Sequence, residues 1–188
     1  MVRLTKIYTR GGDKGKTSLG DGTRVCKSDP RIIALCAIDE ANATIGLVRL
    51  DLSGHLEQMI RRIQNDLFDL GADICLPVKT KRENPLRLSE EQVKRLEKEI
   101  DTLNKDLSPL TSFVLPGGTK ASTHLHLART VTRRAECAMI SLNKKSPVNP
   151  LAIQYINRLS DLLFVLARTL NDHGNRDVLW VPGEHHSL

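Results

Sequence analysis

A chain-breaking turn followed by a long uninterrupted stretch constrains the fold of this chain most. The turn is Pro-Gly-Gly at 116–118, and Thr119 follows it where a helix N-cap residue would stand. No glycine or proline occurs from residue 120 to residue 146, so a helix of about six turns can form there. The stretch therefore predicts one long helix with a sharply defined start.

Charged side chains are concentrated on this predicted helix. Arg129, Arg133 and Glu136 recur at spacings of four and three residues, which aligns them along one face. Arg134 lies beside that row. Clustered arginines on a helix indicate either a solvated surface or a site for several phosphates. Small residues around the arginines favour a helix with close neighbours and so the second interpretation: Ala128, Thr130, Thr132, Ala135 and Ala138.

The composition indicates one helical globular domain. With 188 residues, of which 40% are hydrophobic, the chain can bury a substantial core. Aromatic residues make up only 3%, so the core must consist of leucine, isoleucine, valine and alanine. The net charge of +6 predicts attraction to polyanions. The scarcity of aromatic residues argues against nucleic acid, because single-strand binders stack bases on aromatic rings.

Cysteine spacing and the termini indicate a cytoplasmic protein. The four cysteines lie far apart without a C-x-x-C motif, which is typical of reduced thiols rather than of a zinc site or disulfide scaffold. No apolar run approaches the ~20 residues of a membrane span. Residues 1–9 lack the apolar core of a signal peptide. We therefore expect no membrane association.

The segment 1–27 is rich in glycine, lysine and hydroxyl residues and has no helical period. Backbone N–H groups, hydroxyls and ammonium groups are the components of a phosphate-binding loop. The segment does not fit the Walker A motif, which would require glycine where Arg10 stands. The alternative interpretation is a flexible tail.

We expect a single domain over 1–188. After the segment 1–27, the pattern predicts an all-α, five-helix up-and-down bundle over 28–171 and a tail over 172–188. The expected helices span 28–52, 54–75, 89–107, a fourth from 120 onward, and 150–171. Ser28-Asp29-Pro30 and the Ser89/Gln92 pair are strong helix starts. The first helix carries an apolar row of Ile32, Leu35, Cys36, Ala43, Gly46 and Leu50.

Asp39 interrupts that apolar row. A carboxylate that faces a core or an interface needs a cationic partner or hydrogen bonds, because burying it alone costs several kcal/mol. Asp39 therefore indicates either such a partner or a local backbone contact. In the fifth helix, Asn157, Arg158 and Asp161 are comparable polar positions among apolar ones.

Three motifs resemble the PduO-type ATP:cob(I)alamin adenosyltransferases. They are T-K-I-Y-T-R-G-G-D-K-G-K-T-S-L at 5–19, F-V-L-P-G-G-T at 113–119 leading into A-R-T-V-T-R-R-A-E at 128–136, and Y-I-N-R-L-S-D-L-L-F-V-L-A-R at 155–168. The resemblance implies a homotrimer of five-helix bundles with active sites between subunits. It implies transfer of the 5′-deoxyadenosyl group of ATP to the cobalt of a reduced corrinoid such as cobalamin, with Mg²⁺ and release of triphosphate. A flavoprotein-type corrinoid reductase and an adenosylcobalamin-dependent enzyme are the partners that this reaction admits.

The resemblance also implies roles for individual residues. Phe113 would lie under the corrin ring and exclude the lower axial ligand. Arg129 would pair with Asp39 of the adjacent subunit. In the N-terminal segment, ATP would be bound by Thr9, Arg10, Gly11, Gly12, Thr17, Ser18 and Lys27. In the fourth and fifth helices, it would be bound by Arg133, Arg134, Ala135, Glu136, Cys137 and Asn157, with Glu136 orienting the arginines or holding Mg²⁺.

Two positions depart from the family pattern: Gly11, where threonine is common, and Cys137, where arginine is frequent. Phe113 also has a purely structural interpretation, as a core plug beneath the fourth helix. His124 and His126 are interpreted as structural or interfacial.

Two other functions compete with adenosyl transfer. A non-catalytic bundle that senses or carries ATP or corrinoid would keep the loop and the arginines. A basic nucleic-acid-binding bundle is the second alternative, and its binding would weaken steeply with salt.

Overall fold

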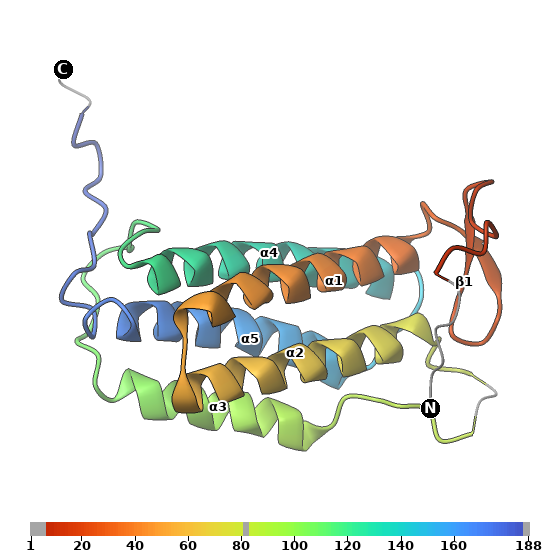
Figure 1. Ribbon diagram of the computed structural model, residues 1–188, viewed down its shortest axis with the longest axis horizontal. Coiled ribbons are helices and arrows are strands. Elements are labelled where there is room, and N and C mark those ends of the chain that lie inside the picture. The colour runs from red at the N-terminus through yellow and green to blue at the C-terminus, as the bar shows by residue number, and fades with distance from the viewer. Residues whose placement is uncertain (1–6, 81–82, 186–188) are drawn as a thin grey trace.

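The computed structural model describes residues 7–80 and 83–185 (Figure 1). The first six residues of the N-terminal segment and the last three of the tail lie outside the described residues. In chain order the elements are β1 (Lys16–Ser18), β2 (Arg24–Cys26), α1 (Pro30–Val48), a 3₁₀ turn (Arg49–Asp51), α2 (Gly54–Cys75), α3 (Glu90–Asn104), α4 (Lys120–Asn143) and α5 (Pro150–Thr169). The predicted all-α class and the five helices of the described chain are confirmed, with ends that differ by a few residues.

The predicted helix starts are confirmed by their caps. The Asp29 carboxylate accepts a hydrogen bond from the backbone N–H of Arg31 at 2.8 Å, and Pro30 is the first residue of α1. Ser89 caps α3 in a capping box with Gln92. The Thr119 hydroxyl accepts from the N–H of Ser122 at 3.2 Å, so α4 begins immediately after the Pro-Gly-Gly turn.

Helices α1 and α4 pack side by side in opposite directions (Figure 1). Arg31, at the start of α1, donates to the hydroxyl of Ser146, just beyond the end of α4, at 2.7 Å. At the other end, His124 in α4 lies 3.0 Å from the carboxylate of Asp51, just beyond α1. Helix α5 packs against both α3 and α4, and α2 packs against α1. These neighbouring helices and their directions are those of an up-and-down bundle.

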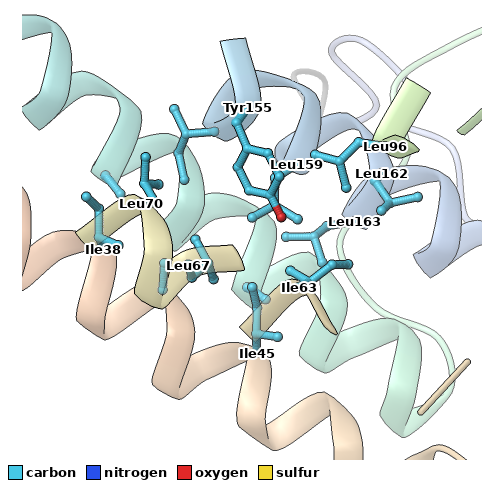
Figure 2. Packing of buried hydrophobic residues seen from close by; sticks show 14 of the residues in the cluster. Ile38, Ile45, Ile63, Leu67, Leu70, Leu96, Tyr155, Leu159, Leu162 and Leu163 are labelled. Carbon is cyan, nitrogen blue, oxygen red and sulfur yellow. The ribbon is translucent and has the colours of Figure 1, made fainter. Parts of the chain in front are cut away.

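The core consists almost entirely of aliphatic side chains, as the composition predicts. Figure 2 shows Leu67, Leu159 and Leu163 meeting in the bundle interior, around the one fully buried aromatic ring in the described cluster. That ring belongs to Tyr155, whose hydroxyl donates to the carboxylate of Asp66 at 3.1 Å. The buried polar group is thereby satisfied, as burial requires.

The predicted apolar row of α1 was assigned to the wrong face. The side of α1 that packs in the core carries Ala34, Ile38, Ala41, Ile45 and Val48. The predicted row, which includes Cys36, Asp39 and Leu50, lies partly or fully exposed. The reason is that α1 is apolar on two sides, and a period of 3.6 cannot tell which of them faces the core.

The N-terminal segment contains regular structure that the sequence did not predict. Strands β1 and β2 form an antiparallel hairpin in which Thr17 lies opposite Val25. This hairpin stands beyond the end of the bundle where α1 begins (Figure 1).

The C-terminal segment is not a free tail over its described part. The backbone N–H of Leu115 donates to the carbonyl of Val178 at 2.8 Å, and the N–H of Trp180 donates to the carbonyl of Phe113 at 2.8 Å. The segment that was expected to be a tail therefore pairs with the segment that precedes α4. None of the described helices is long and apolar enough to cross a membrane.

Two isoleucines of α1 test which of its faces packs in the core. Ile38 is 2% exposed and Ile33 is 51% exposed. Ile38→Ala should lower the free energy of unfolding by about 2–5 kcal/mol, because it removes buried carbons and leaves a cavity. Ile33→Ala should change it by less than about 0.5 kcal/mol. Urea unfolding followed by circular dichroism measures both, and equal losses would show that the assignment of faces is wrong.

Candidate functional site

A cavity of ≈ 690 Å³ opens between α4, α5 and the segment that precedes α4. Helix α4 contributes Arg129 and Arg133, and α5 contributes Ser160, Asp161 and Phe164. The remaining wall consists of Leu110, Thr111, Ser112, Phe113, Val114 and Trp180. One side of the cavity is therefore cationic and the other is apolar and aromatic.

Small residues on α4 place the arginines at the edge of this cavity. Ala128, Thr132 and Ala135 are completely buried, which lets α4 lie close to its neighbours. Because Arg129 and Arg133 follow on the adjoining stripe of the helix, their side chains leave the core and line the cavity. Arg129 is half-buried there, whereas Arg133 is exposed.

Arg129 is held in a partly desolvated position. Its guanidinium lies over the ring of Phe164, 5.9 Å from the centroid, and its Nε is buried without a hydrogen-bond partner among the described residues. Burial lowers the pKa of Arg129, and the charge of Arg133 lowers it further. Two neighbouring cations with spare hydrogen-bond capacity favour binding of a polyanion.

Two carboxylates lie near the arginines: Asp161 lines the cavity, and Glu136 lies one turn beyond Arg133 on α4, outside the lining. Burial raises the pKa of Asp161, and the charge of Arg158 opposes that rise. The Glu136 carboxylate accepts a hydrogen bond from the Asn157 amide at 2.9 Å, which links α4 to α5. A carboxyl group that takes up a proton more readily repels an incoming phosphate less.

Phe113 lies at the mouth of the cavity and not in the core. Its side chain is 77% exposed, and its ring centroid lies 6.0 Å from that of Trp180 at an interplanar angle of 48°. The interpretation of Phe113 as a core plug is therefore wrong. The residue presents an aromatic surface without a donor atom to whatever occupies the cavity.

The rest of the predicted α4 set does not line this cavity. Arg134 forms an ion pair with Glu40 of α1. Ala135 is completely buried in the core, and Cys137 is exposed. Of the α4 residues assigned by resemblance, the structure thus brings Arg129 and Arg133 together with Phe113.

The two histidines of α4 fit the structural interpretation. His124 contacts Asp51. His126 is buried against Phe164, and both of its ring nitrogens lack a hydrogen-bond partner among the described residues. Burial lowers the pKa of His126, and the charge of Arg129 adds to that effect.

In the N-terminal hairpin, Arg24 holds the predicted phosphate-binding loop in shape. Its guanidinium donates to the carbonyls of Gly11 and Lys16, at 2.7 and 3.3 Å, and to the Ser18 hydroxyl at 3.2 Å. Lys27 lies against Gly12, where an added Cβ would come within 3.1 Å of the lysine Nζ. These contacts join Arg24 to the backbone and side chains between Gly11 and Ser18. The loop contains Thr9, Arg10 and Thr17, with Arg10 in the left-handed region at φ 59°.

The hairpin and the Phe113 segment lie at opposite ends of the bundle (Figure 1). Helix α4 alone has 24 residues, which corresponds to a length of about 36 Å. No ligand as small as a nucleotide reaches from the hairpin to Phe113 of the same chain. One subunit therefore does not bring together all the residues that the sequence assigned to one site.

Asp39 occupies a third position. It lines a separate cavity of ≈ 280 Å³ between α1 and α2, together with Leu35, Cys36 and Phe68. Within the described part of the chain it forms no ion pair with Arg129 or with any other cation. Phe68 beside it is largely exposed, so an acidic group here sits in an uncovered apolar surface.

Several site residues escaped prediction from the sequence. Arg24 carries no motif signal, and Phe164 lies within the motif at 155–168 but was given no role there. Trp180 is the only tryptophan of the chain, and in a sequence so poor in aromatic residues that alone could have drawn attention to it. Asp161 was identified as a polar residue in an apolar helix, but without a role.

Comparisons with known proteins give the family. The profile of the family described as Cobalamin adenosyltransferase matches residues 7–170. The Corrinoid adenosyltransferase of Mycobacterium tuberculosis is 49% identical, over 97% of this chain and 96% of its own. The Cobalamin adenosyltransferase of Cupriavidus metallidurans is 45% identical, with 95% of each chain covered.

Solved structures agree with this match. A phenylalanine-to-alanine variant of the PduO-type ATP:corrinoid adenosyltransferase from Lactobacillus reuteri, complexed with cobalamin and ATP, superposes with a TM-score of 0.88 at 35% identity. The alignment covers 93% of this chain and 99% of that one. The fold, the arginine-lined cavity and the extent of these matches lead to one conclusion: the chain belongs to the cobalamin adenosyltransferase family, in its PduO-type branch.

Proposed function

We propose that the protein transfers the 5′-deoxyadenosyl group of ATP to the cobalt of a reduced corrinoid and releases triphosphate. The observation that carries this proposal is the two-sided cavity, in which Arg129 and Arg133 face an apolar wall with Phe113 and Trp180. A polyphosphate suits the first side and a flat macrocycle suits the second. The name of the Mycobacterium tuberculosis relative and the complex of the Lactobacillus reuteri protein with cobalamin and ATP support the same two ligands.

The chemistry asks little of the side chains. The electron pair on cobalt(I) forms the Co–C5′ bond while the C5′–O bond of ATP breaks, and the two electrons of the C5′–O bond leave with triphosphate. Because the substrate supplies the nucleophile, the protein needs only to align cobalt with C5′, stabilise the leaving group and exclude water.

The arginines are positioned to stabilise the leaving group. Arg129 is partly desolvated and Arg133 reaches the same cavity, so charge that develops on triphosphate would be met by fixed cations in a site of low polarity. The N-terminal loop, with Lys27 against Gly12, supplies backbone N–H groups and a further cation for the phosphates.

Mg²⁺ is proposed as the metal of the nucleotide. The described residues contain no group of three or more His, Cys, Asp or Glu side chains that could enclose a metal ion. Mg²⁺ does not need such a cluster, because it is commonly held by one or two carboxylates and by substrate phosphates. Asp161 lines the cavity, and Glu136 lies one turn beyond Arg133 on α4, outside the lining. These are the carboxylates available to the ion, and its chemical contribution would be to neutralise charge on the phosphates.

We also propose that the protein acts as a homotrimer with sites between subunits. Three observations support an assembly: the split of the site between opposite ends of one bundle, the second apolar side of α1, and Asp39 in an uncovered apolar surface. An ion pair between Asp39 and Arg129 of a neighbouring subunit would give the Asp39 carboxylate a cationic partner and the Arg129 Nε a hydrogen-bond acceptor.

The proposed setting is the cytoplasm. The reaction consumes cobalt(I), which a flavoprotein-type corrinoid reductase is suited to supply, and an adenosylcobalamin-dependent enzyme would use the product. A sensor or carrier of ATP and corrinoid is the competing function. It would bind both ligands in the same cavity without cleaving ATP.

The decisive assay mixes the protein anaerobically with ATP, Mg²⁺ and chemically reduced cobalamin. Adenosyl transfer predicts the absorbance change of Co–C bond formation together with one triphosphate per corrinoid. Binding of both ligands without either product would favour the sensor, and would overturn the proposed reaction.

Arg133→Lys tests the phosphate role. A guanidinium binds two phosphate oxygens at once, whereas an ammonium group is a point charge. The substitution should raise the barrier by about 2–4 kcal/mol while leaving the melting temperature unchanged, because Arg133 is exposed. Steady-state kinetics alongside the exposed control Arg61→Lys measures the effect. A rate within twofold of wild type would show that Arg133 does not bind phosphate and is only part of a solvated surface.

Asp39→Asn tests the proposed assembly. Removing one partner of a buried ion pair typically costs about 3–5 kcal/mol, which here would be divided between trimer formation and site geometry. Sedimentation should show weaker association and the assay lower activity, whereas the exposed control Asp101→Asn should leave both unchanged. A stable wild-type monomer would contradict the interface.

Phe113→Ala tests the aromatic wall. Because Phe113 is 77% exposed, truncation should barely change the melting temperature, while activity from cobalt(II) plus reductant should collapse. Phe113→His should be more harmful, because an imidazole could ligate the metal that must lack a lower ligand. Spectra of bound cobalt(II) corrinoid provide the measurement. A four-coordinate signature that survives Phe113→Ala would show that the ring only packs.

A further inference from the structure

The segment that holds Phe113 in place lies outside the part of the chain that defines the family. The family profile ends at residue 170, yet the chain continues from α5 through a turn and returns to the cavity as far as Trp180. Figure 1 shows this last described segment at the end of the bundle where α4 begins. Its contacts with the Phe113 segment assign it a function in the site.

The two segments pair as a short antiparallel bridge. Val114 lies opposite Leu179, with a backbone hydrogen bond of 2.8 Å on each side of the pair. The Ser112 hydroxyl adds a bond of 2.6 Å to the carbonyl of Trp180. The rings of Phe113 and Trp180 are in contact, tilted by 48° to each other. The exposed Phe113 is thus positioned by its partner strand and not by the core.

A buried ion pair anchors the partner strand to α5. Arg168 Nε donates to Asp177 Oδ2 at 2.8 Å, and the two side chains are only 7% and 3% exposed. It is the least exposed ion pair among the described residues. Arg168 also donates to the carbonyl of Ser108 at 3.0 Å, which fixes the chain ahead of the Phe113 segment. Such a network rigidifies what it joins when every member is satisfied.

The same network reaches the other end of the Phe113 segment. The Asn171 amide donates to Asp177 Oδ1 at 2.8 Å, and its oxygen accepts from the N–H of Thr119 at 3.3 Å. At Gly118, where φ is +102°, an added Cβ would come within 2.2 Å of that oxygen. The turn before α4 is therefore packed directly against Asn171, and both flanks of Phe113 are tied to one carboxylate.

We propose that Asp177 is a positioning residue for the corrinoid side of the cavity: through Arg168 and Asn171 it fixes the strand that presents Phe113. The inference rests on the proposed function, because it concerns the same cavity and its corrinoid. Asp177 does not line the cavity, so its effect on the substrate is exerted through Phe113 and Trp180.

Asp177→Asn tests this role, since it keeps the shape of the side chain and removes the charge that Arg168 needs. Asp177→Glu keeps the charge and serves as the conservative rescue. Asp172→Asn is the matched control, because Asp172 is exposed in the same turn and asparagine tolerates its left-handed backbone. Trp180→Ala removes the ring that contacts Phe113 at a partly exposed position, where loss of the fold is not at issue.

The readouts are ATP affinity, melting temperature and the fraction of bound cobalt(II) cobalamin with a four-coordinate spectrum. We expect Asp177→Asn to lower that fraction by about tenfold or more, because it leaves Arg168 without its partner in a buried pair. Trp180→Ala should lower the fraction as well, because it removes the ring beside Phe113. ATP affinity should be unchanged in both variants. Asp177→Glu should recover part of the four-coordinate fraction, and Asp172→Asn should match the wild type.

The outcomes separate this inference from the proposed function. A wild type that binds no corrinoid refutes the proposed function itself. A wild type that forms the four-coordinate species, with Asp177→Asn and Trp180→Ala equal to it, overturns the positioning role alone. If Asp177→Asn loses its helical circular dichroism, the test depends on Trp180→Ala. A four-coordinate cobalt(II) spectrum equal to that of the wild type in Trp180→Ala would then overturn the proposal.

Discussion

The close approach of α4 to α1 and α5 is the contact on which the rest of the structure depends. Ala128, Thr132 and Ala135 present only small side chains on the buried side of α4, so the neighbouring helices lie near its axis. The long side chains on the adjoining stripe then have no place in the core. Arg129 is held over Phe164 at the boundary, and Arg133 reaches into the cavity. The cationic side of the site thus follows from the packing of small residues, not from a separate structural element.

The features that could be predicted from the sequence are those that depend only on residues close together in the chain. Helix starts at Asp29, Ser89 and Thr119 were identified because caps, proline and glycine act within a few residues. The predicted face of α1 was wrong because that helix is apolar on two sides, and only its neighbours decide which side is buried. The role of the C-terminal segment was missed for the same reason. The contact between Trp180 and Phe113 joins residues that lie far apart in the sequence. The contact between Arg24 and Gly11 joins residues in a segment without a periodic pattern. Neither contact could therefore be predicted from local sequence.

The second apolar side of α1 and the divided site have one common explanation. A bundle of this size needs one buried stripe per helix, yet α1 carries another that includes Asp39 and adjoins the exposed Phe68. The hairpin, which we propose to bind phosphate, and the aromatic wall lie at opposite ends of the bundle, too far apart to serve one ligand within a chain. Both features are satisfied if neighbouring subunits bring the hairpin of one bundle to the arginines of another. The central claim is therefore that each site is complete only between two copies of the chain.

Mixing two inactive variants tests that claim most directly. Lys27→Ala disables the hairpin and Arg133→Ala disables the arginine wall, so each homo-oligomer should be inactive. After dissociation and reassembly of an equimolar mixture, a site shared between subunits should be intact in one of four random pairings. We therefore predict recovery of about a quarter of wild-type adenosyl transfer. Activity no higher than that of the separate variants would contradict a shared site and would place the whole reaction within one subunit.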